Sequence, residues 1–295
     1  MSIGEQIKRS SSLPRKAGEG GRRRETMASG WGWLRENVLA YLALFRRKPR
    51  PLRAAPATLL QLIVWTAAAI VLIGAAMYFV DARAVGIAQR LPAWLIALAD
   101  ELTDFGRATW ILVPTGGLLV LIAVLASAGL SRISQHVLAA GAVKLSFLFT
   151  ACALPGLMVT TVKRLIGRAR PLVDGSANPF LYHPFGWKVE YAGMPSGHAT
   201  NAFAAAVAIG ALWPRARPFM WAYAIVIALT RVALTAHFPS DVLAGAFVGA
   251  AGALLVRRWF AARRLGFFQN QAGLIIALPG PSVSRLKRVA GQLFR

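Results

Sequence analysis

The stretch that decides the fold is GMPSGHATNAFAAAVAIGALW, residues 193–213. Its first half carries Pro-Ser-Gly-His, and its second half is an almost pure run of Ala, Val and Ile. The whole chain has 295 residues, of which 56% are hydrophobic, and this fraction is too high for an ordinary soluble domain. The composition therefore indicates a polytopic membrane protein, with the titratable His198 at the mouth of one span.

Membrane spans are expected wherever roughly 20 apolar residues follow one another. Lys and Arg flank alternate connections between such segments, which the positive-inside rule assigns to the cytoplasm. A short helix along the outer surface is expected at 91–106. We therefore expect an all-α fold, a six-transmembrane helix bundle with both termini cytoplasmic. The expected spans are 59–80, 108–130, about 137 or 145 to 162, 198–213, 219–236 and 239–256.

The two ends of the chain are basic and lie outside the expected spans. Because the net charge of +23 is concentrated there, it indicates a membrane surface rather than nucleic acid as the partner. A helix expected at about 31–48 either lies in the membrane interface or packs on the bundle. Either Met1 or Met27 is the true start. We expect a basic, partly disordered cytoplasmic segment, a six-span domain and a basic cytoplasmic tail, at 1–58, 59–257 and 258–295 respectively.

A first group of candidate functional residues lies in KRLIGRARP, residues 163–171, where the topology disfavours cations. Lys163 and Arg170 are seven residues apart, so on a continuous helix they share one face. Arg164 and Arg168 share a different face, and Pro171 is expected to end the helix. Taken alone, the group is also compatible with a collar of snorkelling basic side chains.

The second group is Pro-Ser-Gly-His, residues 195–198. Ser196 is a good helix N-cap, Gly197 lets an anion approach the backbone closely, and the helix dipole favours negative charge there. His198 is then placed beside any bound phosphate as a proton donor. The alternative is an ordinary N-cap with an interfacial histidine.

The third group is TRVALTAHFPSD, residues 230–241. Arg231 ends the fifth span, His237 lies in the turn, and Asp241 falls in the first turn of the sixth span. An aspartate at this distance can accept a hydrogen bond from one imidazole nitrogen, which leaves the other nitrogen unprotonated, as a histidine nucleophile requires. A structural His–Asp pair that caps the sixth span is the alternative.

All three groups fall on the same outer side of the expected topology. Together they supply cations, a helix N-terminus, two histidines and a carboxylate. No Cys, His and Asp residues have the spacing of a metal site, so we expect neither a metal nor another cofactor. The charge of a phosphoryl group would then be met by Lys, Arg and backbone N–H groups. The residues indicate a metal-free phosphoryl-transfer site.

These three groups, in this order, resemble the tripartite signature of the type 2 phosphatidic acid phosphatases. That family belongs to a superfamily with bacterial acid phosphatases and vanadium haloperoxidases. The resemblance covers about Leu59 to Val256, and it implies a six-span fold with a site near the outer surface. One departure is visible: Thr230 stands where the family usually has serine, and because a hydroxyl is kept, we expect a phosphate or helix contact to survive.

The resemblance also implies a role for each matching residue. His237 would attack phosphorus to form a phosphohistidine, and Asp241 would orient it. His198 would protonate the leaving group and then activate water. The implied phosphate-binding residues are Lys163, Arg170, Arg231, Ser196 and Gly197. Arg164 and Arg168 lie outside the matching positions, and a contact with the headgroup or the lipid surface is expected for them.

The sequence thus predicts an integral lipid phosphatase of a bacterial inner membrane, with its active site at the periplasmic face and a lipid phosphate as its substrate. Undecaprenyl diphosphate, phosphatidylglycerophosphate, phosphatidate and lipid A 1-phosphate are all candidates. The rival from another class is a transporter of anions or lipids that uses the same basic vestibule. A path across the bilayer would need polar groups at mid-depth, whereas the middles of four expected spans carry no charge.

Overall fold

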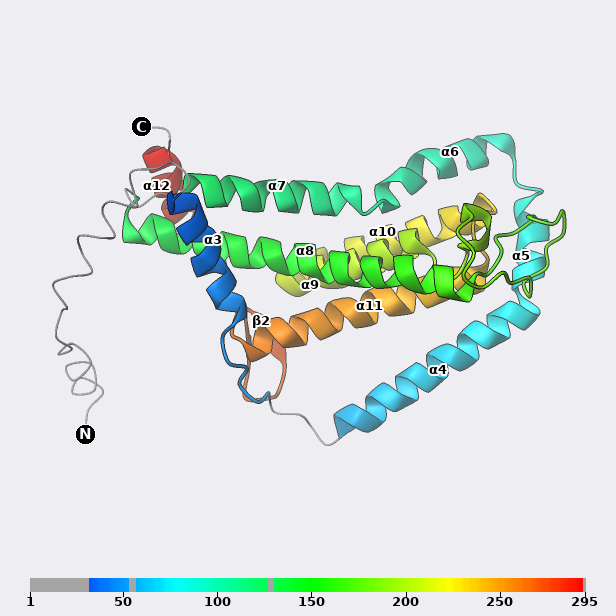
Figure 1. Ribbon diagram of the computed structural model, residues 1–295, viewed down its shortest axis with the longest axis horizontal. Helices are drawn as coiled ribbons and strands as arrows, with labels where there is room; N and C mark the ends of the chain where they lie inside the picture. Colours follow the sequence, from blue (N-terminus) through cyan, green and yellow to red (C-terminus); the bar gives the residue numbers. More distant parts are fainter. Residues whose placement is uncertain (1–31, 53–56, 127–129, 294–295) are drawn as a thin grey trace.

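Figure 1 shows the computed structural model, which describes residues 32–52, 57–126 and 130–293. The described part is mostly helical, as expected, with one small hairpin of two strands. The tail expected before the first helix lies outside the described residues. The α-helices are α3 (Gly32–Phe45), α4 (Ala57–Phe79), α5 (Asp81–Ala88), α6 (Ala93–Thr103), α7 (Thr109–Leu125), α8 (Arg132–Ile166), α9 (Gly197–Leu212), α10 (Arg217–Ala233), α11 (Pro239–Ala262) and α12 (Val283–Leu293).

Four described helical stretches are long and apolar enough to cross a membrane: Leu60–Phe79, Ala93–Leu125, Arg132–Ile166 and Pro239–Ala262. α9 is a shorter apolar helix of 16 residues, and α10 has 17 residues. The expected helical segments are therefore present, although the third is longer than expected at both ends. The count of six spans and the cytoplasmic placement of both termini remain predictions.

The expected short helix at 91–106 is α6 followed by the 3₁₀ helix η2 (Asp104–Gly106). These elements lead almost directly into α7, so that α6, η2 and α7 together form one of the long apolar stretches. The placement of α6 along the outer surface therefore remains a prediction.

α9 lies at the centre of the bundle and packs against α8, α10 and α11. Alanine fills most of its buried positions, and this lets the neighbouring helices approach closely. A Cβ atom at Gly245 of α11 would lie 2.4 Å from the carbonyl oxygen of Ser196, and one at Gly249 would lie 2.2 Å from that of Thr200. These glycines, spaced four residues apart, are therefore required for the contact between α9 and α11. The buried alanines of α9 are Ala199, Ala202, Ala204, Ala205, Ala206, Ala208 and Ala211.

α3 packs on the bundle, which is one of the two alternatives expected for it. Asn37 Nδ2 donates to the carbonyl oxygen of Ala126 at 2.5 Å, and Tyr41 Oη donates to that of Ala142 at 3.3 Å. The Phe45 ring lies edge-on to that of Phe260 of α11, with centroids 5.8 Å apart. α3 is thus anchored to α7, α8 and α11.

The chain beyond α11 folds back onto the same end of the bundle. Strand β1 (Phe267–Gln269) pairs antiparallel with β2 (Ile275–Ala277), and Phe267 is buried against Phe147 of α8, with ring centroids 4.7 Å apart. α12 follows, and Gln292 Oε1 accepts a hydrogen bond of 2.6 Å from Ser134 Oγ. α3 and α12 therefore lie at one end of the long helices, while α5 and the loop after α8 lie at the other (Figure 1).

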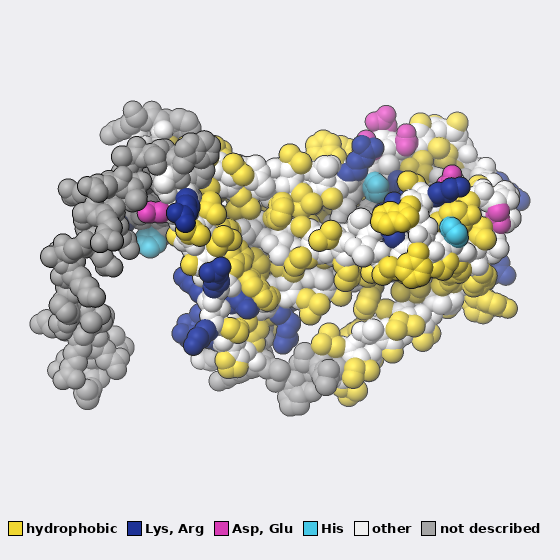
Figure 2. Space-filling model, in the orientation of Figure 1, with side chains coloured by type: hydrophobic (Ala, Val, Ile, Leu, Met, Phe, Trp, Pro, Cys, Tyr) yellow, Lys and Arg dark blue, Asp and Glu magenta, His cyan; other side chains and the backbone are white. Residues whose placement is uncertain are grey.

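Hydrophobic side chains cover the middle of the molecule, and charged side chains gather towards its two ends (Figure 2). Large apolar residues are exposed along the long helices, including Trp65 and Val71 of α4, each 70% exposed. An apolar belt between polar ends is the surface expected of a protein surrounded by lipid.

Candidate active site

The three sequence groups come together at the end of the bundle that carries α5. Lys163 lies in the last turn of α8, Ser196 is the N-cap of α9, and Arg231 lies in the last turn of α10. His237 lies in the turn before α11, and Asp241 in its first turn. Each helix of the central bundle thus contributes from its end nearest α5.

The end of α8 differs from the expectation. The helix ends at Gly167, which has φ +63° in the left-handed region, and not at Pro171. Lys163 and Arg170 therefore do not share a continuous helical face. A Cβ atom at Gly167 would lie 2.0 Å from the carbonyl oxygen of His183, so only glycine permits this close turn. The two cations nevertheless remain close enough for their charges to interact.

The loop after α8 is held in place by backbone hydrogen bonds. Arg170 N donates to the carbonyl oxygen of Glu190 at 2.8 Å, which fixes the position of this cation. Arg164 Nη1 donates to the carbonyl oxygens of Trp187 and Lys188. The contact observed for Arg164 is thus with the loop.

Ser196 and Gly197 begin α9 as expected. Ser196 N donates to the backbone carbonyl oxygen of Asp241 at 2.9 Å, which ties the start of α9 to the start of α11. A Cβ atom at Gly197 would meet nothing within 4 Å, so the backbone there is open to a ligand. The Ser196 side chain makes no capping hydrogen bond, which differs from the usual role of a serine at this position.

Arg231 is 9% exposed, and its Nη1 donates to Thr103 Oγ1 at 2.7 Å. Thr230 Oγ1 lies 3.1 Å from the same hydroxyl and donates to the carbonyl oxygen of Ile227 at 2.7 Å. The hydroxyl of Thr230 therefore makes the helix contact that its sequence position suggested. Thr103 of α6, which orients Arg231, was not identified from the sequence.

His237 and Asp241 are both buried and face each other. His237 Nδ1 lies 3.7 Å from Asp241 Oδ2, which is longer than a hydrogen bond, whereas the sequence suggested that such a bond could form. Asp241 Oδ2 instead accepts from Phe238 N at 2.9 Å. Burial lowers the pKa of His237, the Asp241 carboxylate opposes this shift, and the charges of Arg231 and Arg170 reinforce it. The imidazole is therefore held neutral near pH 7.

His198 lies in the first turn of α9, within electrostatic range of His237, Arg231 and Arg170. Its ring packs against Gly106 of η2, so closely that a Cβ atom at Gly106 would lie 3.0 Å from His198 Cδ2. The two histidines and two of the cations thus belong to one electrostatic cluster. This cluster is the arrangement that the three sequence groups indicated.

Several buried polar atoms of this cluster have no hydrogen-bond partner among the described residues. They are Arg170 Nε, Ser196 Oγ, Arg231 Nε and His237 Nδ1. Buried polar groups normally have a hydrogen-bond partner. Arginine and serine donors fit the acceptor oxygens of a phosphate group. Within the described residues, no group of three or more Cys, His, Asp and Glu side chains is placed to hold a metal.

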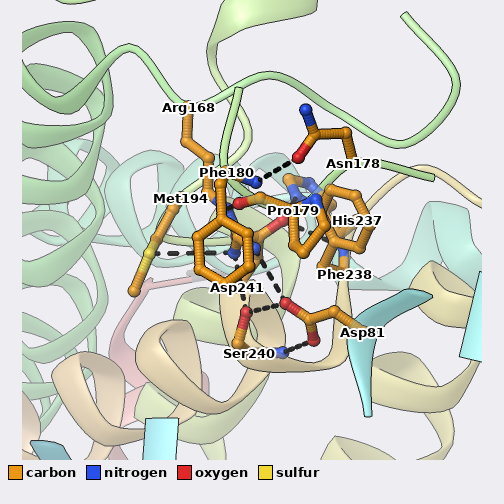
Figure 3. A network of polar contacts seen from close by, with 10 residues as sticks. All are labelled: Asp81, Arg168, Asn178, Pro179, Phe180, Met194, His237, Phe238, Ser240 and Asp241. Carbon is orange, nitrogen blue, oxygen red and sulfur yellow. Dashed lines mark hydrogen bonds and ion pairs between the residues drawn. The ribbon is translucent and has the colours of Figure 1, made fainter. Parts of the chain in front are cut away.

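Arg168 does not lie at the surface, where a contact with the headgroup or lipid was expected. Its side chain is fully buried, and Nη2 lies 2.8 Å from Asp81 Oδ2 and Nη1 2.5 Å from Asp241 Oδ1 (Figure 3). Asp81, the first residue of α5, lies outside the three sequence groups. The contact of Arg168 with Asp241 places this arginine beside the candidate catalytic residues.

The comparisons with known proteins point to one family. The PAP2 superfamily matches residues 144–265. A lipid A 1-phosphatase of Rhizobium etli is 35% identical over 169 residues, covering 56% of this chain and 71% of that protein. A lipid A 1-phosphatase of Rhizobium johnstonii is 34% identical over 178 residues, covering 59% and 71% respectively.

Two solved structures are also similar to this chain. The crystal structure of Aquifex aeolicus LpxE has a TM-score of 0.43 at 20% identity, covering 60% of this chain and 93% of that chain. The crystal structure of a transmembrane PAP2 type phosphatidylglycerolphosphate phosphatase from Bacillus subtilis has a TM-score of 0.36 at 19% identity, covering 76% and 94% respectively.

Proposed function

We propose that this chain, which belongs to the PAP2 superfamily and is a membrane lipid phosphatase, removes the 1-phosphate of lipid A through a phosphohistidine intermediate. The observation that carries the proposal is the meeting of His237, His198, Arg170 and Arg231 at one end of the bundle, with buried donors suited to phosphate oxygens. The choice of lipid A among the candidate lipids rests on the two lipid A 1-phosphatases that are 34–35% identical to this chain.

In the first step, the neutral imidazole of His237 attacks phosphorus through Nε2. Its Nδ1 faces Asp241, so the positive charge that develops on the ring lies next to a carboxylate. The bond between phosphorus and the lipid oxygen breaks, and His198 gives that oxygen its proton. The products of this step are the dephosphorylated lipid and a phosphohistidine.

In the second step, His198 takes a proton from water as the water oxygen attacks phosphorus. The bond between phosphorus and His237 breaks, which releases inorganic phosphate and regenerates the neutral imidazole. The same residue thus acts first as an acid and then as a base, and the proton balance over one turnover is closed.

The transferred phosphoryl group carries negative charge on its non-bridging oxygens, which Lys163, Arg170 and Arg231 would neutralise. The Ser196 hydroxyl and the backbone at Gly197 would add hydrogen bonds at the N-terminus of α9, where the helix dipole favours an anion. These fixed donors supply the stabilisation that a divalent metal supplies in other phosphatases, so we propose a metal-independent reaction.

The topology proposed for this function has six crossings: α4, the stretch of α6 and α7, and α8 to α11. Both termini would then be cytoplasmic, and the active site would face the periplasm from the inner membrane. The Lys and Arg residues that flank the expected cytoplasmic connections support this orientation, because Figure 2 shows a group of Lys and Arg side chains near α3 and the end of α11, at the opposite end from α5.

Phosphate release by the detergent-purified chain, in excess chelator, tests the proposal. The substrates are 1-phosphorylated lipid A, phosphatidylglycerophosphate, phosphatidate and undecaprenyl diphosphate, with His237→Ala as the inactive control. Release from lipid A alone that disappears in the variant is the expected result. Release from a different lipid would refute the substrate, and loss of activity with the chelator would refute the metal-independent mechanism.

A further inference from the structure

We propose that Arg168 and Asp81 are positioning residues for the reaction, because together they fix the carboxylate of Asp241 against His237. This inference deepens the proposed function and rests on the role of Asp241 given there. Neither residue is within the positions that resemble the family signature.

Arg168 uses its whole guanidinium group inside the protein. Its Nε donates to the carbonyl oxygen of Pro179 at 2.9 Å, and Nη1 donates to Ser240 Oγ at 2.7 Å and to Asp241 Oδ1 at 2.5 Å. Nη2 donates to Asp81 Oδ2 at 2.8 Å (Figure 3). Its Cζ also lies 4.7 Å from the ring centroid of Phe238. The side chain is therefore held from several directions and has one available position.

Asp241 is held at both oxygens as a result. Oδ1 accepts from Arg168, and Oδ2 accepts from Phe238 N at 2.9 Å. A carboxylate fixed at both ends cannot rotate, and Oδ2 is the oxygen that faces His237 Nδ1. Arg168 thus decides which way the carboxylate of Asp241 points, and it acts on the imidazole through this carboxylate.

Asp81 secures the other side of Arg168. Its Oδ1 accepts from Ser240 N at 3.0 Å, and its Oδ2 accepts from Ser240 Oγ at 2.5 Å. Asp81 begins α5, and Ser240 and Asp241 lie in the first turn of α11. The carboxylate of Asp81 therefore joins the turn after α4 to the helix that carries the catalytic aspartate.

The charges of this group support a catalytic purpose. A single arginine bound to Asp241 would neutralise the charge that stabilises the phosphohistidine. Two carboxylates around one guanidinium leave a net charge of −1, so Asp241 is fixed in place while the group stays negative. A structural role alone would not need this arrangement, since buried ion pairs can often be replaced by apolar side chains without loss of stability.

A double-mutant cycle tests the inference. The variants are Arg168→Lys, Asp81→Asn and Asp241→Asn, alone and with each positioning change combined with Asp241→Asn. Phosphate release from 1-phosphorylated lipid A gives kcat and KM for each. Because misplacement of a catalytic group by about 1 Å costs on the order of a hundredfold, we expect each positioning variant to lower kcat about ten- to a hundredfold, with KM little changed.

The combined variants give the decisive result. If Arg168 and Asp81 act through Asp241, each should cost less than about twofold once Asp241 is already Asn, because contacting residues of one network are not additive. An equal fold-loss in both backgrounds, or a rise in KM in place of the fall in kcat, would overturn the inference. Full activity of Asp241→Asn alone would instead refute the role of Asp241 in the proposed function.

The controls distinguish an effect on the position of Asp241 from an effect on folding. Arg217→Lys makes the same substitution at the opposite end of α10 from the site, where Arg217 Nε donates to the carbonyl oxygen of Gly210 at 3.0 Å, and should leave kcat within about twofold. Thermal unfolding in detergent reports stability. If Arg168→Lys does not fold, the cycle of Asp81→Asn with Asp241→Asn decides the question, because both changes keep the shape of the side chain.

Discussion

Substitution of Gly245 by alanine links helix packing to the active site. In the structure a Cβ atom there would lie 2.4 Å from the carbonyl oxygen of Ser196, and ordinary contact begins at 3.4 Å. The start of α9 must therefore move away from α11 by about 1 Å, which is on the order of the misplacement that costs a hundredfold in rate. Ser196 N, which donates to the Asp241 carbonyl oxygen, would move with it.

The expected result for Gly245→Ala is a fall in kcat of about ten- to a hundredfold. Overpacking costs about 1–3 kcal/mol, of which a better helix propensity for alanine returns up to about 1 kcal/mol, so a lower unfolding temperature is also expected. Phosphate release and thermal unfolding in detergent measure the two effects. Gly117→Ala in α7 is the matched control, because a Cβ atom there meets nothing within 4 Å. Wild-type rate and stability for Gly245→Ala would refute the reasoning.

Three further outcomes follow from the same geometry. Because burial lowers the pKa of His237, the neutral imidazole should persist at pH values below 6.5, the ordinary pKa of histidine. The value of kcat/KM should therefore fall only at lower pH, and a loss of activity with a midpoint at or above pH 6.5 would contradict this. His198→Ala should slow substrates with poor leaving groups more than those with good ones, since the donated proton matters most there; equal losses would argue against general acid catalysis. Gly167→Ala should lower activity by displacing the loop at His183, where a Cβ atom would lie 2.0 Å from the carbonyl oxygen; an unchanged rate would show that the loop adapts.

The sequence was informative where a local pattern determines the structure. Apolar runs predicted the presence of the helices, although α8 begins earlier than expected and α11 continues beyond residue 256. The N-cap signal at Ser196 correctly placed the start of α9. The spacing of Gly245 and Gly249 is a sequence signal of close helix packing, and the structure shows that the partner helix is α9. The meeting of the three sequence groups followed from the alternation of the spans, which puts the ends of these helices on one side.

The sequence was less informative where distant residues decide. Arg168 was expected to contact the headgroup or lipid surface. This expectation was wrong because Arg168 is buried by an ion pair with Asp81, which lies 87 residues earlier in the chain. The left-handed turn at Gly167 directs the chain away from the helical path, so a helical face drawn through Arg170 was wrong. A charge directly after the uncharged first span was the available signal for Asp81, although its partner could not be identified from spacing.

The phosphohistidine intermediate can be observed directly by rapid quenching of the chain during turnover of 1-phosphorylated lipid A, followed by mass spectrometry of its peptides. His198→Ala should slow the breakdown of the intermediate and increase its yield. We expect an acid-labile phosphoryl group on His237, absent from His237→Ala. Turnover without a phosphorylated peptide in both the unsubstituted chain and His198→Ala, or phosphorylation of a residue other than His237, would contradict the proposed mechanism.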